Sequence, residues 1–129
     1  MPTTLTLDEM KAFVAQHFED FVNNNRPEVI HENMTDDFYD HDGPGGKPTD
    51  AGGDERMMRG MQQAIHGLHV EIDHMVAEGD RVICKNRWSG INSQTGKQIQ
   101  FHGYVEWRFE GAKIAERWAT VTSPTETEP

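Results

Sequence analysis

Apolar residues recur at intervals of three and four in the first part of the chain, and this spacing predicts helices. Residues 8–24 carry one such stripe, so we expect an amphipathic helix there, capped by Thr6 or Asp8. Pro27 is typical of a first helical turn, which predicts a short second helix over 27–34. The apolar stripe of the first helix consists of Met10, Phe13, Val14, His17, Phe18, Phe21 and Val22.

The middle of the chain is rich in glycine and proline. Residues 42–53 contain five glycines and two prolines without a periodic apolar pattern, which indicates a loop. Such a loop is either a lid over a pocket or a surface excursion. Before it, residues 38–41 predict a short strand or an extended stretch. After it, we expect Asp54 to cap a helix that ends near His66.

From residue 70 onward the apolar period changes to two, which predicts strands. We expect four of them, joined by short turns into an antiparallel meander. Helices followed by strands indicate an α+β fold, with one curved sheet wrapped around a helical layer. The length fits a single domain over residues 1–129, with its core at about 8–122. The expected strands are 70–76, 81–90, 99–109 and 114–122.

Alternation along the strands sorts their side chains into two faces. On the third strand, one face is apolar and should pack against the helices; it includes Val105 and Trp107. On the second strand, Asn86 is the polar member of the inward set, so it is either a hydrogen-bonded core residue or a polar group of a pocket. The opposite face is aromatic and charged, and we expect a homodimer to form through it. That face carries His102, Tyr104, Arg108, Glu116 and Trp118.

Charge and cysteine content exclude several classes of protein. The chain has 12 basic and 22 acidic residues, a net charge of −10, and no basic patch, which argues against nucleic-acid or anionic-membrane binding. Cys84 is the only cysteine, so neither an internal disulfide nor a cysteine-built zinc site is expected. Without a basic, then apolar, leader pattern in the first residues, the expected location is cytoplasmic.

Five segments follow a recurrent order along the chain: Phe38–His41, Leu68–Val82, Phe101-x-Gly103, Trp107-Arg108-Phe109 and Gly111-x-Lys113-Ile114-x-Glu116-x-Trp118. In their order and spacing they resemble the SnoaL-like polyketide cyclase family of the nuclear transport factor 2-like superfamily. The resemblance implies that family's fold, a cone in which a curved antiparallel sheet closes over N-terminal helices around a pocket. It also implies homodimers.

The resemblance also implies where catalytic residues would lie. Polyketide cyclases of this family are understood to close a ring by an intramolecular aldol reaction, with an aspartate and a histidine in the pocket. The corresponding positions here are Ala119 and Val105, and neither side chain can transfer a proton.

Two histidines remain as tentative catalytic residues. His41 follows an apolar pair and precedes the glycine-rich loop, so it stands either at a pocket mouth or in a local contact with Asp40 or Asp42. His17 lies on the apolar stripe, where a hydrogen-bonded core histidine is the alternative. Nine further residues are expected to line the pocket: Phe18, Tyr39, Met58, Met61, Asn86, Trp88, Val105, Trp107 and Ala119.

Two functional hypotheses follow. One is a cyclase, isomerase, dehydratase or ester-processing enzyme that transfers a proton next to a carbonyl in a small apolar ligand. The other is a non-catalytic ligand-binding or dimeric assembly module. No cofactor and no metal are expected, because the histidines near residues 66–71 do not follow a recognised ligand spacing.

Overall fold

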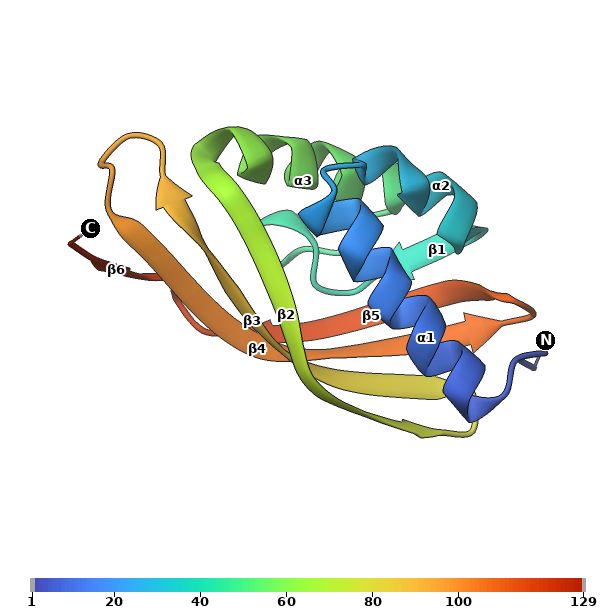
Figure 1. Cartoon of the computed structure of the whole chain (residues 1–129). Coiled ribbons are helices and arrows are strands. Elements are labelled where there is room, and N and C mark those ends of the chain that lie inside the picture. The colour runs from blue at the N-terminus through green and yellow to red at the C-terminus, as the bar shows by residue number, and fades with distance from the viewer. Residues whose placement is uncertain (1, 129) are drawn as a thin grey trace.

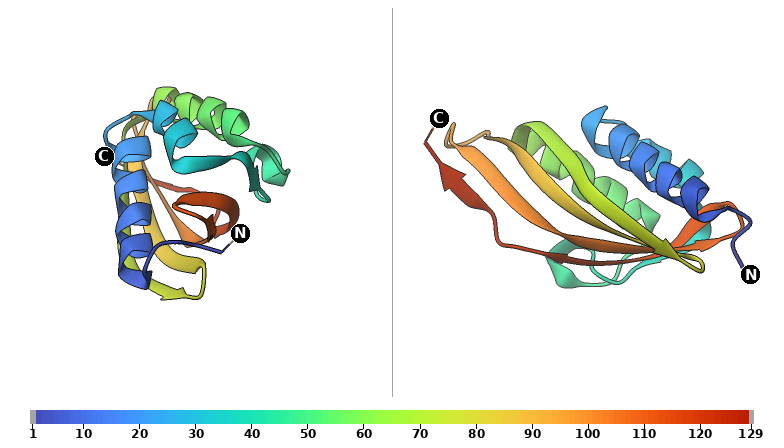
Figure 2. Two further views of the ribbon diagram at one scale, coloured as in Figure 1. Left: turned by 90° about the vertical axis from the view of Figure 1, so that its right-hand side faces the viewer. Right: turned by 60° about the horizontal axis from the view of Figure 1, so that its bottom comes forward.

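The computed structural model describes residues 2–128. Its sheet is strongly curved, and the helices lie on its concave side (Figures 1 and 2). The strand order is β1-β5-β4-β3-β2, with β6 paired to β4 beside this path. The expected α+β architecture is therefore confirmed. The strands are β1 (Met34–Asp40), β2 (Ile65–Glu78), β3 (Arg81–Asn92), β4 (Gln98–Glu110), β5 (Lys113–Val121) and β6 (Thr125–Thr127).

The first helix begins where a capping box predicts it. In α1 (Leu7–Phe18), the Thr6 hydroxyl accepts from the backbone N–H of Glu9, and the Glu9 carboxylate accepts from the N–H of Thr6. The helix continues into a π-helical turn over Glu19–Asn23. The side-chain amide of Asn23 then bonds both backbone groups of Val70, which ties this end of the helical layer to β2.

The expected short helix over residues 27–34 is present and consists of two consecutive parts. A 3-10 turn (Pro27–Val29) and one α-helical turn, α2 (Ile30–Asn33), lead directly into β1. β1 pairs with β5 in parallel, whereas the other neighbouring strands are antiparallel. A parallel edge strand was not expected, because the sequence around residues 38–41 indicated only a short extended stretch.

The helix that follows the glycine-rich segment begins earlier than predicted. In α3 (Ala51–Ala64), the side chain of Asp50 accepts from the backbone N–H of Gly53 at 2.9 Å and caps the helix. Asp54 therefore is not the cap. It lies in the first turn, and its side chain is turned inward, with only 3% of the residue exposed. Before α3, residues Pro44–Gly46 form a short 3-10 turn in which Gly45 and Gly46 have positive φ.

The predicted faces of the sheet are confirmed. Val105, Trp107 and Phe109 of β4 are buried beneath the helices, as are Val82 and Cys84 of β3. On the opposite face Tyr104 is 50% exposed. β5 continues the pattern, because Ala119 pairs with Val105 and Arg117 pairs with Trp107 across the ladder.

The two tryptophans on opposite faces should differ in their effect on stability. Trp107 is 2% exposed, so Trp107→Ala should lower the free energy of unfolding by about 3–5 kcal/mol. Trp118→Ala should cost less in the isolated subunit, because Trp118 lies on the outer face beneath the Arg81 guanidinium. Urea denaturation of both variants at several protein concentrations measures the difference. Equal losses that do not depend on concentration would contradict the assignment of faces.

Candidate active site

A cavity of about 350 Å³ lies between the helices and the concave face of the sheet. α1 and its π-helical extension, α3 and the three strands β3, β4 and β5 all contribute to its wall, and the segment 42–46 lies at one side. Most of the wall is apolar and aromatic. Its polar members are few, and they are His17, Asp42, Asp54, Asn86, Arg117 and Thr120.

Eight of the nine residues that the sequence predicted for the pocket wall line this cavity. The exception is Tyr39, which is exposed on the other side of β1. Of the two histidines, His17 lines the cavity and His41 does not. The eight are Phe18, Met58, Met61, Asn86, Trp88, Val105, Trp107 and Ala119.

His17 is a buried and neutral member of the wall. Its Nδ1 lies 3.0 Å from the side-chain nitrogen of Asn33, and its ring stacks on Phe21 at 4.9 Å between centroids. Burial, with the positive charge of Arg117 as a smaller cause, lowers the pKa of His17 to about 3. The imidazole therefore stays uncharged at neutral pH and is a weak base.

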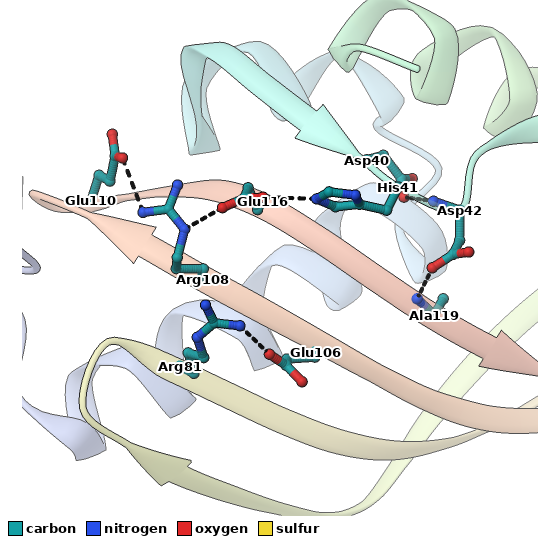
Figure 3. A network of polar contacts seen from close by, with 9 residues as sticks. All are labelled: Asp40, His41, Asp42, Arg81, Glu106, Arg108, Glu110, Glu116 and Ala119. Carbon is teal, nitrogen blue, oxygen red and sulfur yellow. Dashed lines mark hydrogen bonds and ion pairs between the residues drawn. The ribbon is translucent and has the colours of Figure 1, made fainter. Parts of the chain in front are cut away.

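His41 belongs to a network on the outer face of the sheet (Figure 3). Its Nε2 lies 2.7 Å from Oε2 of Glu116, and its ring stacks on Trp118 at 4.6 Å. The other carboxylate oxygen of Glu116 accepts from Arg108, so these two residues form an ion pair. The hydrogen bonds of His41 hold the pKa of Glu116 below its usual value, with Arg108 contributing less. The predicted local contact of His41 with Asp40 or Asp42 is replaced by this network.

A buried ion pair joins the first and last long strands beside the cavity. Arg117 Nη1 donates to Oδ2 of Asp40 at 2.9 Å, and Asp40 is completely buried. The guanidinium also lies over the Trp107 ring, 5.6 Å from its centroid. Sequence reasoning missed this pair. The available signal was alternation, because Arg117 falls on the same inward face as Ala115 and Ala119.

Asp54 lies beside this ion pair, and its surroundings favour the protonated form of its carboxyl group. Burial raises the pKa of its carboxyl to about 8, and a hydrogen bond with Asp40 and the negative charge of Asp40 act in the same direction. Among residues 2–128, Oδ1 of Asp54 has no hydrogen-bond partner. The signal in the sequence was the spacing of Asp54 to Met57, Met58 and Met61, which places all four on one side of α3.

Two further polar groups of the wall are buried without partners in the described part of the chain. They are the side-chain amide of Asn86 and the indole Nε1–H of Trp107. A buried polar group without a partner costs about 1–3 kcal/mol, so these atoms are suited to bind water or a polar atom of a ligand. Asn86 is thus a polar group of the pocket, one of the two alternatives left open by the sequence.

Asp42 brings a second carboxyl group to the cavity. Its Oδ2 accepts from the backbone N–H of Ala119 at 2.7 Å (Figure 3). Its own N–H donates to Oδ1 of Asp40 at 2.9 Å. The glycine-rich segment therefore starts from a fixed point on the edge of β5, and residues 43–46 extend from it along the cavity.

Among residues 2–128, no three His, Cys, Asp or Glu side chains come together as a set of metal ligands. None of the helices in that range has the length and apolar character needed to cross a bilayer.

The fold and the cavity define the class of protein: an α+β cone of the nuclear transport factor 2-like type. The family model described as SnoaL-like polyketide cyclase matches residues 12–122, so the chain belongs to this family. A search of curated protein sequences gave no significant match.

Solved structures agree on the fold. AclR of Streptomyces galilaeus, a candidate hydroxylase, has a TM-score of 0.81 at 20% identity, covering 91% of this chain and 81% of its own. A candidate polyketide cyclase of Bacillus cereus has a TM-score of 0.78 at 22% identity, with 93% and 83% covered. IdmH of Streptomyces antibioticus, another candidate polyketide cyclase, has a TM-score of 0.77 at 21% identity, with 86% and 90% covered.

The proton on Asp54 should make stability depend on pH. The unfolded carboxyl loses its proton at the ordinary pKa of about 4, whereas the folded one keeps it up to about 8. The contribution of Asp54 to stability is therefore present below about pH 4 and is lost as the pH rises toward 8. Relative to Asp54→Asn, the natural protein should lose about 2–3 kcal/mol between about pH 5 and pH 7. Urea denaturation at the two pH values measures this, and parallel curves would show that Asp54 is ionised.

Proposed function

We propose that this protein is a cyclase- or isomerase-type enzyme that transfers a proton next to a carbonyl group in a small, uncharged and largely apolar compound. The observation that carries the proposal is the buried carboxylic acid of Asp54 in the wall of an apolar cavity. A carboxyl group that keeps its proton near neutral pH is suited to general acid–base catalysis.

The composition of the wall supports the class of ligand. The cavity volume of about 350 Å³ lies within the range typical of small-molecule sites. Aromatic and methionine side chains dominate its surface, among them Phe18, Phe21, Trp88 and Met61. Such a wall favours rings and alkyl groups, and the guanidinium of Arg117 that also lines it is engaged by Asp40.

Two hydrogen-bond donors without partners in the cavity wall support the proposal that the ligand contains a carbonyl group. The amide nitrogen of Asn86 and the indole nitrogen of Trp107 are hydrogen-bond donors, and both lack acceptors in residues 2–128. A carbonyl oxygen that accepts from these donors would gain further from them as negative charge develops during enolisation. His17, the tentative catalytic residue that does line the cavity, would contribute as a neutral imidazole and not as a strong base.

Exchange of hydrogen for deuterium next to a ketone tests the proposal without knowledge of the natural substrate. With 2-tetralone in deuterium oxide, the natural protein should accelerate exchange of the hydrogens next to the carbonyl, as measured by proton NMR. Asp54→Asn should slow this exchange by about 100-fold or more, because the amide keeps the shape but cannot supply the proton.

Asp37→Asn is the matched control. Asp37 is exposed on β1 and does not line the cavity, so exchange should not change in this variant. Binding of 2-tetralone without accelerated exchange would contradict an enzyme and favour the ligand-binding module, for which Ala119 and Val105 in the cavity wall are the supporting feature.

We also propose that the protein acts as a homodimer joined through the outer face of the sheet. Tyr104 and Ile83 are exposed there, and aromatic and charged groups surround them. Light scattering at micromolar concentration should give about twice the chain mass of 14.7 kDa. A mass of one chain at that concentration would contradict the dimer.

A further inference from the structure

Asp42 reaches the cavity because the chain follows the edge of β5 after β1 ends. The backbone N–H of His41 donates to the carbonyl oxygen of Arg117 at 2.9 Å, which continues the contact between the two segments. The next free N–H along β5 is that of Ala119, and the Asp42 side chain accepts from it at 2.7 Å. The carboxyl group thus takes the place of a strand partner.

Three contacts fix Asp42 in this position. Besides the bond from Ala119, its backbone N–H donates to Asp40 at 2.9 Å, and its carbonyl oxygen accepts from Arg117 Nη1 at 3.4 Å. Asp40 and Arg117 are themselves held in the buried ion pair. The carboxyl group of Asp42 is therefore positioned by the sheet edge, although it precedes a glycine-rich segment.

We propose that Asp42 is the general base of this cavity, the residue that removes the proton from the carbon next to the carbonyl. This inference rests on the proposed function and deepens it. One carboxylate oxygen, Oδ2, is engaged by the N–H of Ala119, and no hydrogen bond of residues 2–128 engages Oδ1. The residue lines the same cavity as the unpartnered amide of Asn86 and the unpartnered indole N–H of Trp107, which indicate where a ligand oxygen binds.

The two aspartates divide the proton transfers between them. Asp42 takes the proton from carbon, and the electron pair of the broken C–H bond forms the carbon–carbon double bond of the enol. Asp54 gives its proton to the carbonyl oxygen, so that the new O–H bond balances the broken one. After this step Asp42 is protonated and Asp54 is ionised near Arg117. Asp42 then returns a proton to carbon while the enol O–H returns its proton to Asp54, which regenerates the ketone and both carboxyl groups. Exchange of the Asp42 proton with deuterium oxide before this return places deuterium on carbon.

Different environments suit the two carboxyl groups to these opposite roles. Asp54 is buried against Asp40, whose charge and hydrogen bond favour the protonated form. Asp42 is only half-buried, and its carboxyl group accepts the backbone N–H of Ala119 at the margin of the cavity. A proton donor and a proton acceptor can therefore coexist in one small cavity.

Asp42→Asn separates the catalytic role from the anchoring role. The amide oxygen of asparagine can still accept from the N–H of Ala119, so the melting temperature and the binding of 2-tetralone, followed by tryptophan fluorescence, should stay unchanged. Deuterium exchange into 2-tetralone should fall by about 100-fold or more in kcat, with KM unchanged. Asp42→Ala removes the anchor as well and should lower the melting temperature. Asp37→Asn serves again as the control.

The outcomes distinguish this inference from the proposed function. Exchange at the natural rate in Asp42→Asn, with an active natural protein, would overturn the assignment of Asp42 and leave the proposed function intact. A natural protein that binds 2-tetralone but does not accelerate exchange would overturn the proposed function and the base assigned within it. Loss of exchange in Asp42→Asn together with loss of binding would assign Asp42 to ligand binding and overturn its role as base.

Discussion

The cavity depends on the buried ion pair between Arg117 and Asp40. Charges removed from water are costly unless their partners are complete, and loss of one member of such a pair typically costs 3–5 kcal/mol. Here both oxygens of Asp40 are used, one by Arg117 and one by the N–H of Asp42. The aromatic ring of Trp107 lies near the guanidinium. The ion pair joins β1 to β5. Arg117 lines the cavity there together with Asp54 of α3.

Placement of Asp40 on the inward side decides where its neighbours lie. Side chains alternate along an extended chain, so Tyr39 and His41 face outward. On the outer side of β5, His41 contacts Trp118 and Glu116, and the Tyr39 ring packs against His41. Asp42 then returns to the cavity side. One strand end therefore supplies an ion pair for the interior, an aromatic and charged network for the exterior, and a carboxyl group for the site.

Much of the fold and part of the site could be predicted from the sequence. Period-two alternation identified Val105 and Trp107 as inward residues, the family resemblance assigned Ala119 to the pocket, and all three line the cavity. The sequence did not predict that Asp54 lies in the cavity wall, because it was expected to cap the helix. Asp50, not Asp54, caps α3, and this shift of one helical turn is what brings Asp54 inside.

The local sequence pattern does not predict which strand β1 pairs with. Its pairing with β5 is parallel and joins residues about 77 positions apart, as between Asp40 and Arg117. Short segments without a strong period carry no signal for such a partner. Without that pairing, His41 could be assigned to the pocket and Asp42 to a loop, whereas the structure places them on opposite sides of β5.

Burial determines which side chains in this cavity could act as acids or bases. Removal from water disfavours charge of either sign, so it lowers the pKa of His17 and raises that of Asp54. A histidine at the centre of such a wall loses its basicity, while an aspartic acid gains a proton that it can donate near neutral pH. In the proposed mechanism the base therefore lies at the margin of the cavity, where the half-buried Asp42 accepts a backbone N–H. Carboxyl groups at two depths can therefore provide the chemistry that neither histidine in its observed position can provide.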